Sequence, residues 1–243
     1  MSWRCCESYD DFLRRIFSFQ NPTFTFGVGR FEPSGSVPYK VNADGTFSSF
    51  IGDTVVFDLE QSQKHFIKTH YIEPLYSVSW NCFAEKFYES TLHMTLHDLN
   101  SSQYNDFAVM QKMFETEVEL ARRLRDVAHK PDDIHMVTTC VFNMVNTSLV
   151  LGLKPKTEED YGKLMKLYYL VDEVCQLPYP LTPHITLAYY NRYGFEGEQL
   201  GEIERVVNEM NRDSFEITLS TGKLYYQKFL NMNEFFNIMP FIR

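Results

Sequence analysis

The feature that most constrains this chain is a short polar and apolar alternation that occurs twice. The segment Thr91–His97 reads Thr-Leu-His-Met-Thr-Leu-His, and Thr182–Ala188 reads Thr-Pro-His-Ile-Thr-Leu-Ala. In each segment a histidine is followed two positions later by a threonine. A period of two is typical of a half-buried β-strand, whose successive side chains point to opposite faces. We therefore predict two strands, each with one imidazole and one hydroxyl side by side on its polar face.

Patterns elsewhere in the chain predict the remaining elements. Apolar residues at helical spacing indicate helices over 105–129, 157–177 and 199–211. We expect the first of these helices to bury an apolar stripe made of Phe107, Met110, Phe114, Val118, Ala121, Leu124 and Val127. Strands are predicted at 54–59, 134–143 and 147–153, and a closing strand pair at 215–220 and 223–230.

The order of these elements predicts the fold class. In each half of the chain a His-x-Thr strand is followed by an amphipathic helix and then by strands. This order favours an α+β fold in which residues 1–243 form a single bilobal, duplicated domain. Two antiparallel β-sheets with flanking helices would then enclose a central cleft, with the catalytic strands near 91–97 and 182–188. Residues 1–45 are expected to be an N-terminal extension with loops.

Composition limits the possible partners. The net charge of −9 argues against wrapping a long nucleic-acid duplex, because such binding depends on many contacts between Lys or Arg and phosphates. The five cysteines have irregular spacing and form neither a disulfide framework nor a zinc pattern. No apolar run reaches the roughly 18 residues of a membrane span. We expect a monomeric cytoplasmic protein without a membrane segment.

Two histidines and two threonines on facing strands have the groups needed for phosphoryl chemistry. One imidazole can accept the proton of an attacking hydroxyl while the other gives a proton to the leaving oxygen. The neighbouring threonine hydroxyls can donate hydrogen bonds to the non-bridging phosphate oxygens. His93, Thr95, His184 and Thr186 are therefore the predicted catalytic residues. This chemistry needs neither a metal ion nor a cofactor.

A zinc site is the main alternative for the first segment. His93 and His97 are four residues apart, and on a helix they would share one face as metal ligands. On a strand they are about 13 Å apart, too far to share one ion. We therefore interpret His97 as a residue at the cleft edge or in solvent. A single histidine on an amphipathic strand is usually structural, so the functional prediction depends on the matched pair.

The paired motifs, His93-Met-Thr95 and His184-Ile-Thr186, resemble those of the 2H phosphoesterase superfamily. That superfamily includes RNA 2′,3′-cyclic phosphodiesterases, 2′-5′ RNA ligase-like proteins and nucleotide-binding relatives. The lead-in segments 42–46 and 52–56 resemble a microbial branch of it. The resemblance covers about residues 40–240 and implies a bilobal fold with function at the two motifs. It does not fix the substrate.

The sequence thus favours a metal-independent phosphodiesterase that acts on a small nucleotide or an RNA end and opens a 2′,3′-cyclic phosphate. Either histidine can be the base, and the other is then the acid. Tyr190 follows the polar parity of its strand and is a candidate to stack on a base, while Lys223 and Tyr225 are candidates to contact a phosphate. The alternatives are a nucleotide-binding module that uses the same cleft without turnover, and a purely structural interaction protein.

Overall fold

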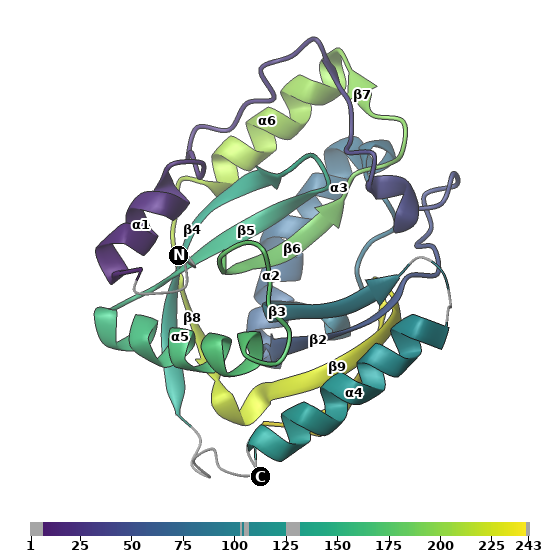
Figure 1. Cartoon of the computed structure of the whole chain (residues 1–243). Coiled ribbons are helices and arrows are strands. Elements are labelled where there is room, and N and C mark those ends of the chain that lie inside the picture. Colours follow the sequence, from purple (N-terminus) through teal and green to yellow (C-terminus); the bar gives the residue numbers. More distant parts are fainter. Residues whose placement is uncertain (1–6, 103, 105–106, 125–131, 242–243) are drawn as a thin grey trace.

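The computed structural model describes residues 7–102, 104, 107–124 and 132–241. Six α-helices and ten strands make up its regular structure within those ranges (Figure 1). The helices are α1 (Tyr9–Phe17), α2 (Gln61–Ile67), α3 (Glu73–Ser79), α4 (Phe107–Arg123), α5 (Glu158–Asp172) and α6 (Glu198–Met210). The strands are β1 (Arg30–Phe31), β2 (Ile51–Asp58), β3 (His93–Ser102), β4 (Asp133–Met144), β5 (Ser148–Pro155), β6 (His184–Tyr189), β7 (Phe195–Glu196), β8 (Glu216–Ser220), β9 (Leu224–Asn231) and β10 (Glu234–Pro240).

One antiparallel sheet of eight strands organises the fold, in the order β10-β9-β2-β3-β6-β5-β4-β8. It consists of two four-stranded halves, and β3 and β6 are the strands that join them. Their register is fixed by one pair of Cα partners, Met94 and Ile185. The predicted α+β fold is confirmed, and the two predicted sheets are the two halves of this curved sheet. A second, two-stranded sheet pairs β1 with β7.

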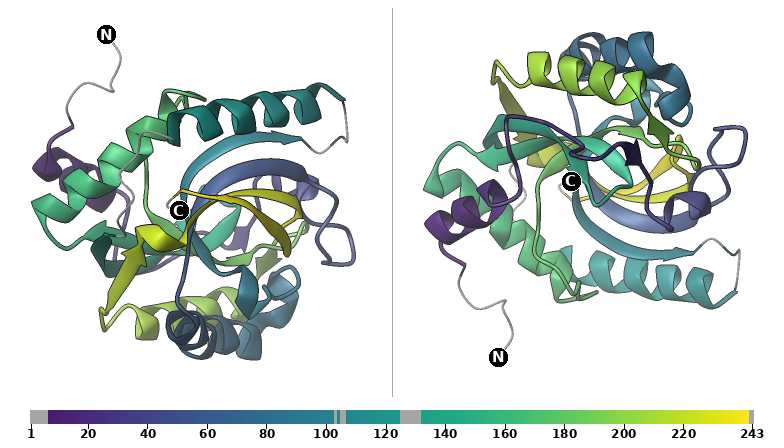
Figure 2. Two further views of the ribbon diagram at one scale, coloured as in Figure 1. Left: turned by 90° about the horizontal axis from the view of Figure 1, so that it is seen from below. Right: turned by 90° about the horizontal axis from the view of Figure 1, so that it is seen from above.

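Helices lie on both sides of the sheet. In Figure 2, α4 and α5 lie on one side and α2, α3 and α6 on the other. Thr157 caps α5, because its hydroxyl accepts a hydrogen bond from the backbone N–H of Asp160. Helix α6 buries Leu200, Ile203, Val206 and Val207. One large core fills the space between these layers, and two smaller buried clusters accompany it in the described part of the chain.

Helix α4 forms as predicted, but the prediction of its buried face is wrong. It packs through Met113, Thr116 and Leu120. The predicted stripe is largely exposed, with Phe107 at 76% and Phe114 at 63% of their full accessibility. Apolar residues occur on more than one face of this helix, so periodicity alone does not decide which face packs on the sheet. Val127 lies outside the described residues.

The predicted pairing of 215–220 with 223–230 is also wrong. Strand β8 pairs with β4, whereas β9 pairs with β2 and β10. The short 3₁₀ turn Thr221–Lys223 between them carries the chain from one half of the sheet to the other. The short turn therefore joins β8 and β9, which pair with different strands and not with each other.

The first 45 residues belong to the folded body from residue 7 on. Helix α1 packs on α5 through Phe12, whose ring centre is 5.1 Å from that of Tyr161. The chain then contacts α6, pairs with β7 through β1 and reaches a bridge between Val41 and Phe47. Its fully or nearly fully buried side chains are Phe12, Ile16, Phe24, Phe31, Val37 and Val41. This segment also contributes Lys40 to the lining of a cavity.

Candidate active site

The two His-x-Thr motifs meet as neighbouring strands. Met94 lies opposite Ile185 in an antiparallel pair, and this register places His93 opposite Thr186 and Thr95 opposite His184. Directly opposed side chains on one face have Cβ atoms about 5 Å apart. All four side chains are half-buried on the face opposite that of Met94 and Ile185, which are fully buried. The structure therefore brings the four predicted catalytic residues into one compact block.

Both imidazoles are held in the same way. The Nδ1 of His93 lies 2.7 Å from the carbonyl oxygen of Thr91, and the Nδ1 of His184 lies 2.7 Å from that of Thr182. A carbonyl can only accept, so each Nδ1 carries the hydrogen and donates it. In the neutral ring Nε2 is then the atom with the free lone pair. The two motifs thus fix the same tautomer, in which Nε2 can exchange a proton with a ligand.

Burial lowers the pKa of both histidines. For His93 desolvation is the largest cause, and its pKa falls to about 4 although the Thr91 carbonyl and Asp58 oppose the shift. The charge of His184 contributes to this lowering, so the two rings are close enough to interact. Desolvation also lowers the pKa of His184, against the effects of the Thr182 carbonyl and Asp98. At neutral pH without ligand, both imidazoles are therefore neutral and able to act as bases.

A cavity of about 320 Å³ opens beside this block. Its lining includes His93, Thr95 and Thr186. His184 does not line it, but its neighbours on the same face, Thr95 and Thr186, do. One part of the wall is aromatic and apolar, formed by Phe50, Phe87, Phe229, Met232 and Phe235. The polar part includes Lys40, Asp53, Asp98, Asn100, Tyr179 and Tyr189, none of which the sequence analysis identified.

A second cavity, of about 350 Å³, lies against the same histidine. His93, Thr91 and Phe235 line both cavities. The rings of His93 and Phe235 meet edge to face, with their centres 4.9 Å apart. Asp58, Ser90, Gln227, Asn233, Glu234 and Asn237 complete the polar lining of the second cavity. The His93 ring therefore lies between two cavities.

A β-bulge follows each motif and changes which side chains face the cavity. In β3 the partners of Val55 and Val56 are His97 and Thr95, so Leu96 is left without a partner. In β6 the partners of Leu149 and Val150 are Ala188 and Thr186, so Leu187 is left out in the same way. An extra residue reverses the alternation of all those that follow.

The bulges explain two incorrect predictions. His97 is only 1% exposed, so it is neither at the cleft edge nor in solvent. Its Nε2 lies 3.2 Å from a carboxylate oxygen of Asp172. Tyr190 is fully buried among Phe26, Phe31, Phe83 and Phe195, and it does not face the cavity. On this strand, the tyrosine that lines the cavity is Tyr189, one residue earlier.

The two other candidate phosphate contacts lie outside the cavity lining. The Nζ of Lys223 forms an ion pair with Glu60 at 2.8 Å. Tyr225 is half-buried on β9, opposite Val56. Neither residue lines the cavity beside the four motif residues.

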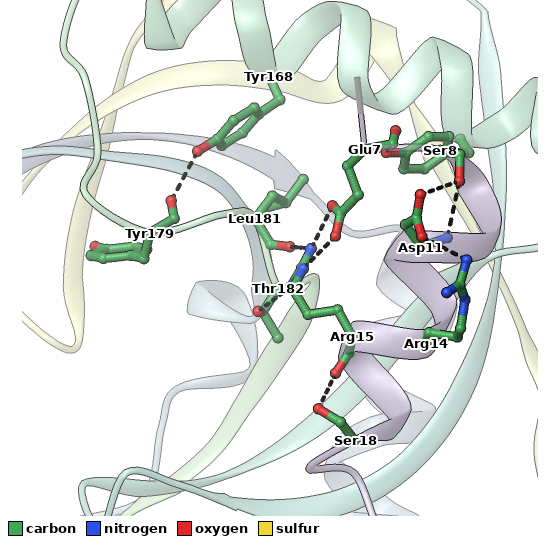
Figure 3. A network of polar contacts seen from close by, with 11 residues as sticks. Glu7, Ser8, Asp11, Arg14, Arg15, Ser18, Tyr168, Tyr179, Leu181 and Thr182 are labelled. Carbon is green, nitrogen blue, oxygen red and sulfur yellow. Dashed lines mark hydrogen bonds and ion pairs between the residues drawn. The ribbon is translucent and has the colours of Figure 1, made fainter. Parts of the chain in front are cut away.

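Helix α1 supports the second motif from outside the cavity (Figure 3). The Arg15 guanidinium donates to the carbonyl oxygen of Leu181 at 2.9 Å and to the hydroxyl of Thr182 at 3.5 Å. A carboxylate of Glu7 binds the same guanidinium at 2.7 Å. Because the Thr182 carbonyl holds the His184 ring, Arg15 and Glu7 fix the segment that orients this imidazole. Both charged side chains are largely buried.

Among the residues with described positions, no three side chains of His, Cys, Asp or Glu gather in a way that could hold a metal ion. None of the helices in that part of the chain has the length and apolar character needed to cross a membrane.

Comparison with known proteins gives a match for the fold. No protein-family model matches the sequence, and no curated protein does. The structure is similar to that of ATU0111, a conserved protein of unknown function from Agrobacterium tumefaciens str. C58, with a TM-score of 0.66 and 19% identity. That match covers 86% of this chain and 94% of ATU0111. The two chains share one fold.

Two further matches are looser. The structure of E. coli LigT complexed with ATP has a TM-score of 0.45 and 14% identity, over 79% of this chain and 96% of LigT. Kluyveromyces marxianus Usb1 has a TM-score of 0.41 and 10% identity, over 79% of this chain and 99% of Usb1.

Proposed function

We propose that this protein is a phosphodiesterase of the 2H type that opens the 2′,3′-cyclic phosphate of a small nucleotide or an RNA end without a metal ion. The observation that carries this proposal is the interlocked arrangement of the motifs, with His93 opposite Thr186 and His184 opposite Thr95. Each histidine thus has a hydroxyl donor from the other motif beside it. A phosphate over this block is contacted from both strands at once.

In the proposed reaction one imidazole is the general base and the other is the general acid. The neutral histidine accepts at Nε2 a proton of the attacking water, whose oxygen forms the new bond to phosphorus. The second histidine, in its protonated form, gives its Nε2 proton to the ribose oxygen as the phosphorus–oxygen bond breaks. The anionic substrate favours this protonated form, because a nearby negative charge raises the pKa of an imidazole. The Thr95 and Thr186 hydroxyls donate to the non-bridging oxygens and stabilise the charge of the transition state.

A panel of nucleoside 2′,3′-cyclic phosphates and a short RNA with a cyclic end, assayed in excess EDTA, tests this function. We expect wild type to release a 2′- or 3′-phosphate and to keep its activity in EDTA. His93→Ala and His184→Ala should each lower kcat by about 10²- to 10⁴-fold. His135→Ala is the matched control, because His135 is exposed on β4 and distant in sequence from both motifs. Activity that survives both motif substitutions would rule out the assignment.

Isosteric substitutions separate catalysis from binding. Thr95→Val and Thr186→Val remove one hydroxyl each and keep the side-chain shape, and each should lower kcat by about 10²- to 10³-fold. The alternative function is a nucleotide-binding module without turnover. It predicts saturable binding of the cyclic nucleotides, weakened by the same two substitutions, with no product at long times. The monomeric state and the cytoplasmic location stay predictions.

A further inference from the structure

Lys40 comes to the cavity from the N-terminal segment, and its backbone is firmly held. The backbone N–H of Lys40 donates to Val37 at 2.9 Å, and its carbonyl accepts from Ser48 at 2.9 Å. The next residue, Val41, is fully buried and forms a bridge with Phe47. The Lys40 side chain therefore extends from a fixed point into the cavity wall.

The ammonium of Lys40 is surrounded by aromatic groups. Its Nζ lies 3.2 Å from the hydroxyl of Tyr189 and 5.1 Å from the ring centres of both Phe50 and Tyr189. Aromatic faces attract a cation, so this arrangement holds the ammonium in place. Lys40 is the only Lys or Arg among the described residues that line the cavity.

No carboxylate neutralises this ammonium directly. Among the described residues no carboxylate oxygen lies within ion-pair distance of Lys40. Seven other lysines in the same ranges do have such a partner: Lys64, Lys68, Lys86, Lys156, Lys163, Lys223 and Lys228. A partly buried cation that lines a cavity without a carboxylate is available for an anionic ligand.

The charge state of Lys40 agrees with this role. Burial opposes the ammonium form, but the Tyr189 hydroxyl and the Asp98 carboxylate outweigh it, and the pKa of Lys40 is raised above its ordinary value. Lys40 therefore stays charged at neutral pH. Its charge also lowers the pKa of His184, so it lies near the reacting groups.

The position of Lys40 points to a group next to the reacting phosphate. The residue that anchors the ammonium, Tyr189, is five positions beyond His184 on β6. Two imidazoles and two hydroxyls already surround the place proposed for the reacting phosphate. Lys40 supplies a positive charge to one side of that block, at the part of the cavity with aromatic walls.

We propose that Lys40 binds a second phosphate of the substrate, one ribose away from the phosphodiester that reacts. The preferred substrate class is then a nucleotide with a cyclic phosphate and a 5′-phosphate, or an RNA end whose next internucleotide phosphate takes that place. This inference rests on the proposed function. It also explains how a chain with net charge −9 can favour a ligand with two phosphates, because a cation is placed in the cavity wall.

Paired substrates test the inference. The first arm compares a nucleoside 2′,3′-cyclic phosphate with its 5′-phosphorylated form, and the second uses a dinucleotide that ends in a cyclic phosphate. For wild type we expect kcat/KM to be about 10- to 100-fold higher for at least one substrate with the second phosphate, as one charged hydrogen bond provides. A preference confined to the dinucleotide identifies the RNA end, and one confined to the mononucleotide identifies the free 5′-phosphate.

Substitutions at Lys40 assign the preference to its charge. Lys40→Met should abolish the preference and leave kcat/KM for the substrate without a second phosphate within about threefold of wild type. Lys40→Arg should restore most of the preference. Lys112→Met is the matched control, because Lys112 is exposed on α4 outside the cavity lining. Lys40→Gln replaces Lys40→Met if thermal unfolding shows that the methionine variant does not fold.

Two results would overturn the inference. One is a wild-type enzyme that does not distinguish the paired substrates. The other is a Lys40→Met variant that slows both substrates equally, which would place Lys40 at the reacting phosphate. If wild type turns over no substrate, the proposed function fails, and binding then decides the role of Lys40. In that case wild type should bind adenosine 3′,5′-bisphosphate about 10-fold or more tightly than 3′-AMP, and Lys40→Met should not; equal affinities in wild type would reject the site.

Discussion

Asp98 and Tyr189 occupy the same place in the two halves of the molecule. Each stands five residues after a motif histidine, each follows a one-residue bulge, and each faces the cavity. Asp98 accepts a hydrogen bond from the Tyr179 hydroxyl at 3.2 Å, and Tyr189 accepts one from Lys40 at 3.2 Å. The duplicated backbone thus presents two different polar groups at equivalent positions. The block of four motif residues is nearly symmetric, whereas its surroundings are not.

Adjacent tyrosines provide a test of the bulge at Leu187. Tyr189→Phe removes the hydroxyl that anchors Lys40, and we expect KM for the doubly phosphorylated substrate to rise by about 3- to 10-fold. Tyr190→Phe removes a buried hydroxyl that has no hydrogen-bond partner. That change should leave KM unaffected and keep or raise the free energy of unfolding, by up to about 1 kcal/mol. Steady-state kinetics and urea denaturation measure the two effects. If Tyr190→Phe alters KM and Tyr189→Phe does not, Tyr190 and not Tyr189 faces the ligand, which would contradict the bulge.

Arg15 should act on catalysis through the position of His184. Arg15→Met removes the hydrogen bonds to Leu181 and Thr182, and we expect kcat to fall about 10-fold with little change in KM. Arg14→Met is the matched control, since Arg14 lies on the exposed side of α1 and, among the described residues, forms an ion pair only with Asp11.

A purely structural role for Arg15 would lower stability without moving the histidine. NMR of the imidazole protons distinguishes the cases, because loosening of the Thr182 segment should broaden or shift the Nδ1–H signal of His184 and leave that of His93 unchanged. Identical signals in Arg15→Met and wild type would contradict the positioning role.

His97 should matter for stability rather than for chemistry. It is buried, and its ring connects the backbone of Asp98 with the carboxylate of Asp172. His97→Ala removes one of the partners of the buried Asp172 carboxylate. We therefore expect the free energy of unfolding to fall by about 3 kcal/mol or more. At a temperature where the variant is folded, kcat should stay within a few-fold of wild type. A loss of kcat as large as that of His93→Ala, with stability unchanged, would instead place His97 in the reaction.

The low pKa of His93 should make the fold sensitive to acid. The folded state resists protonation of His93 down to about pH 4, whereas the unfolded chain takes up this proton near pH 6.5. Stability from this group is therefore fully present above pH 6.5 and is lost as pH falls toward 4. The slope from one such histidine is at most about 1.4 kcal/mol per pH unit.

Urea denaturation at pH 7, 6 and 5 measures this slope. His93→Asn removes the titrating group, so the free energy of unfolding should depend less steeply on pH between 6.5 and 5 than in wild type. His70→Asn is the control for replacing a histidine outside the two motifs, because His70 is exposed. Equal slopes in wild type and His93→Asn would show that burial of His93 does not oppose protonation.

The sequence by itself determined the local character of the site. Alternation around His93 and His184 defined two strands and placed each histidine on the same face as its threonine, because the period of a strand is a property of the local backbone. The same reasoning correctly placed α5 and α6 along the chain. Strong local patterns of this kind do not depend on distant partners.

Tertiary structure decided everything that depends on which segments meet. The bulges at Leu96 and Leu187 exist only relative to the neighbouring strands, so the sequence could not show that His97 and Tyr190 turn inward while Tyr189 turns to the cavity. Lys40 and Tyr189 are 149 positions apart, and only the path of the N-terminal segment brings them together. Contacts with β2 and β3 also determine which face of α4 is buried. The physical reason is the same in each case: pairing register and packing are set by partners far along the chain, and local periodicity carries no information about them.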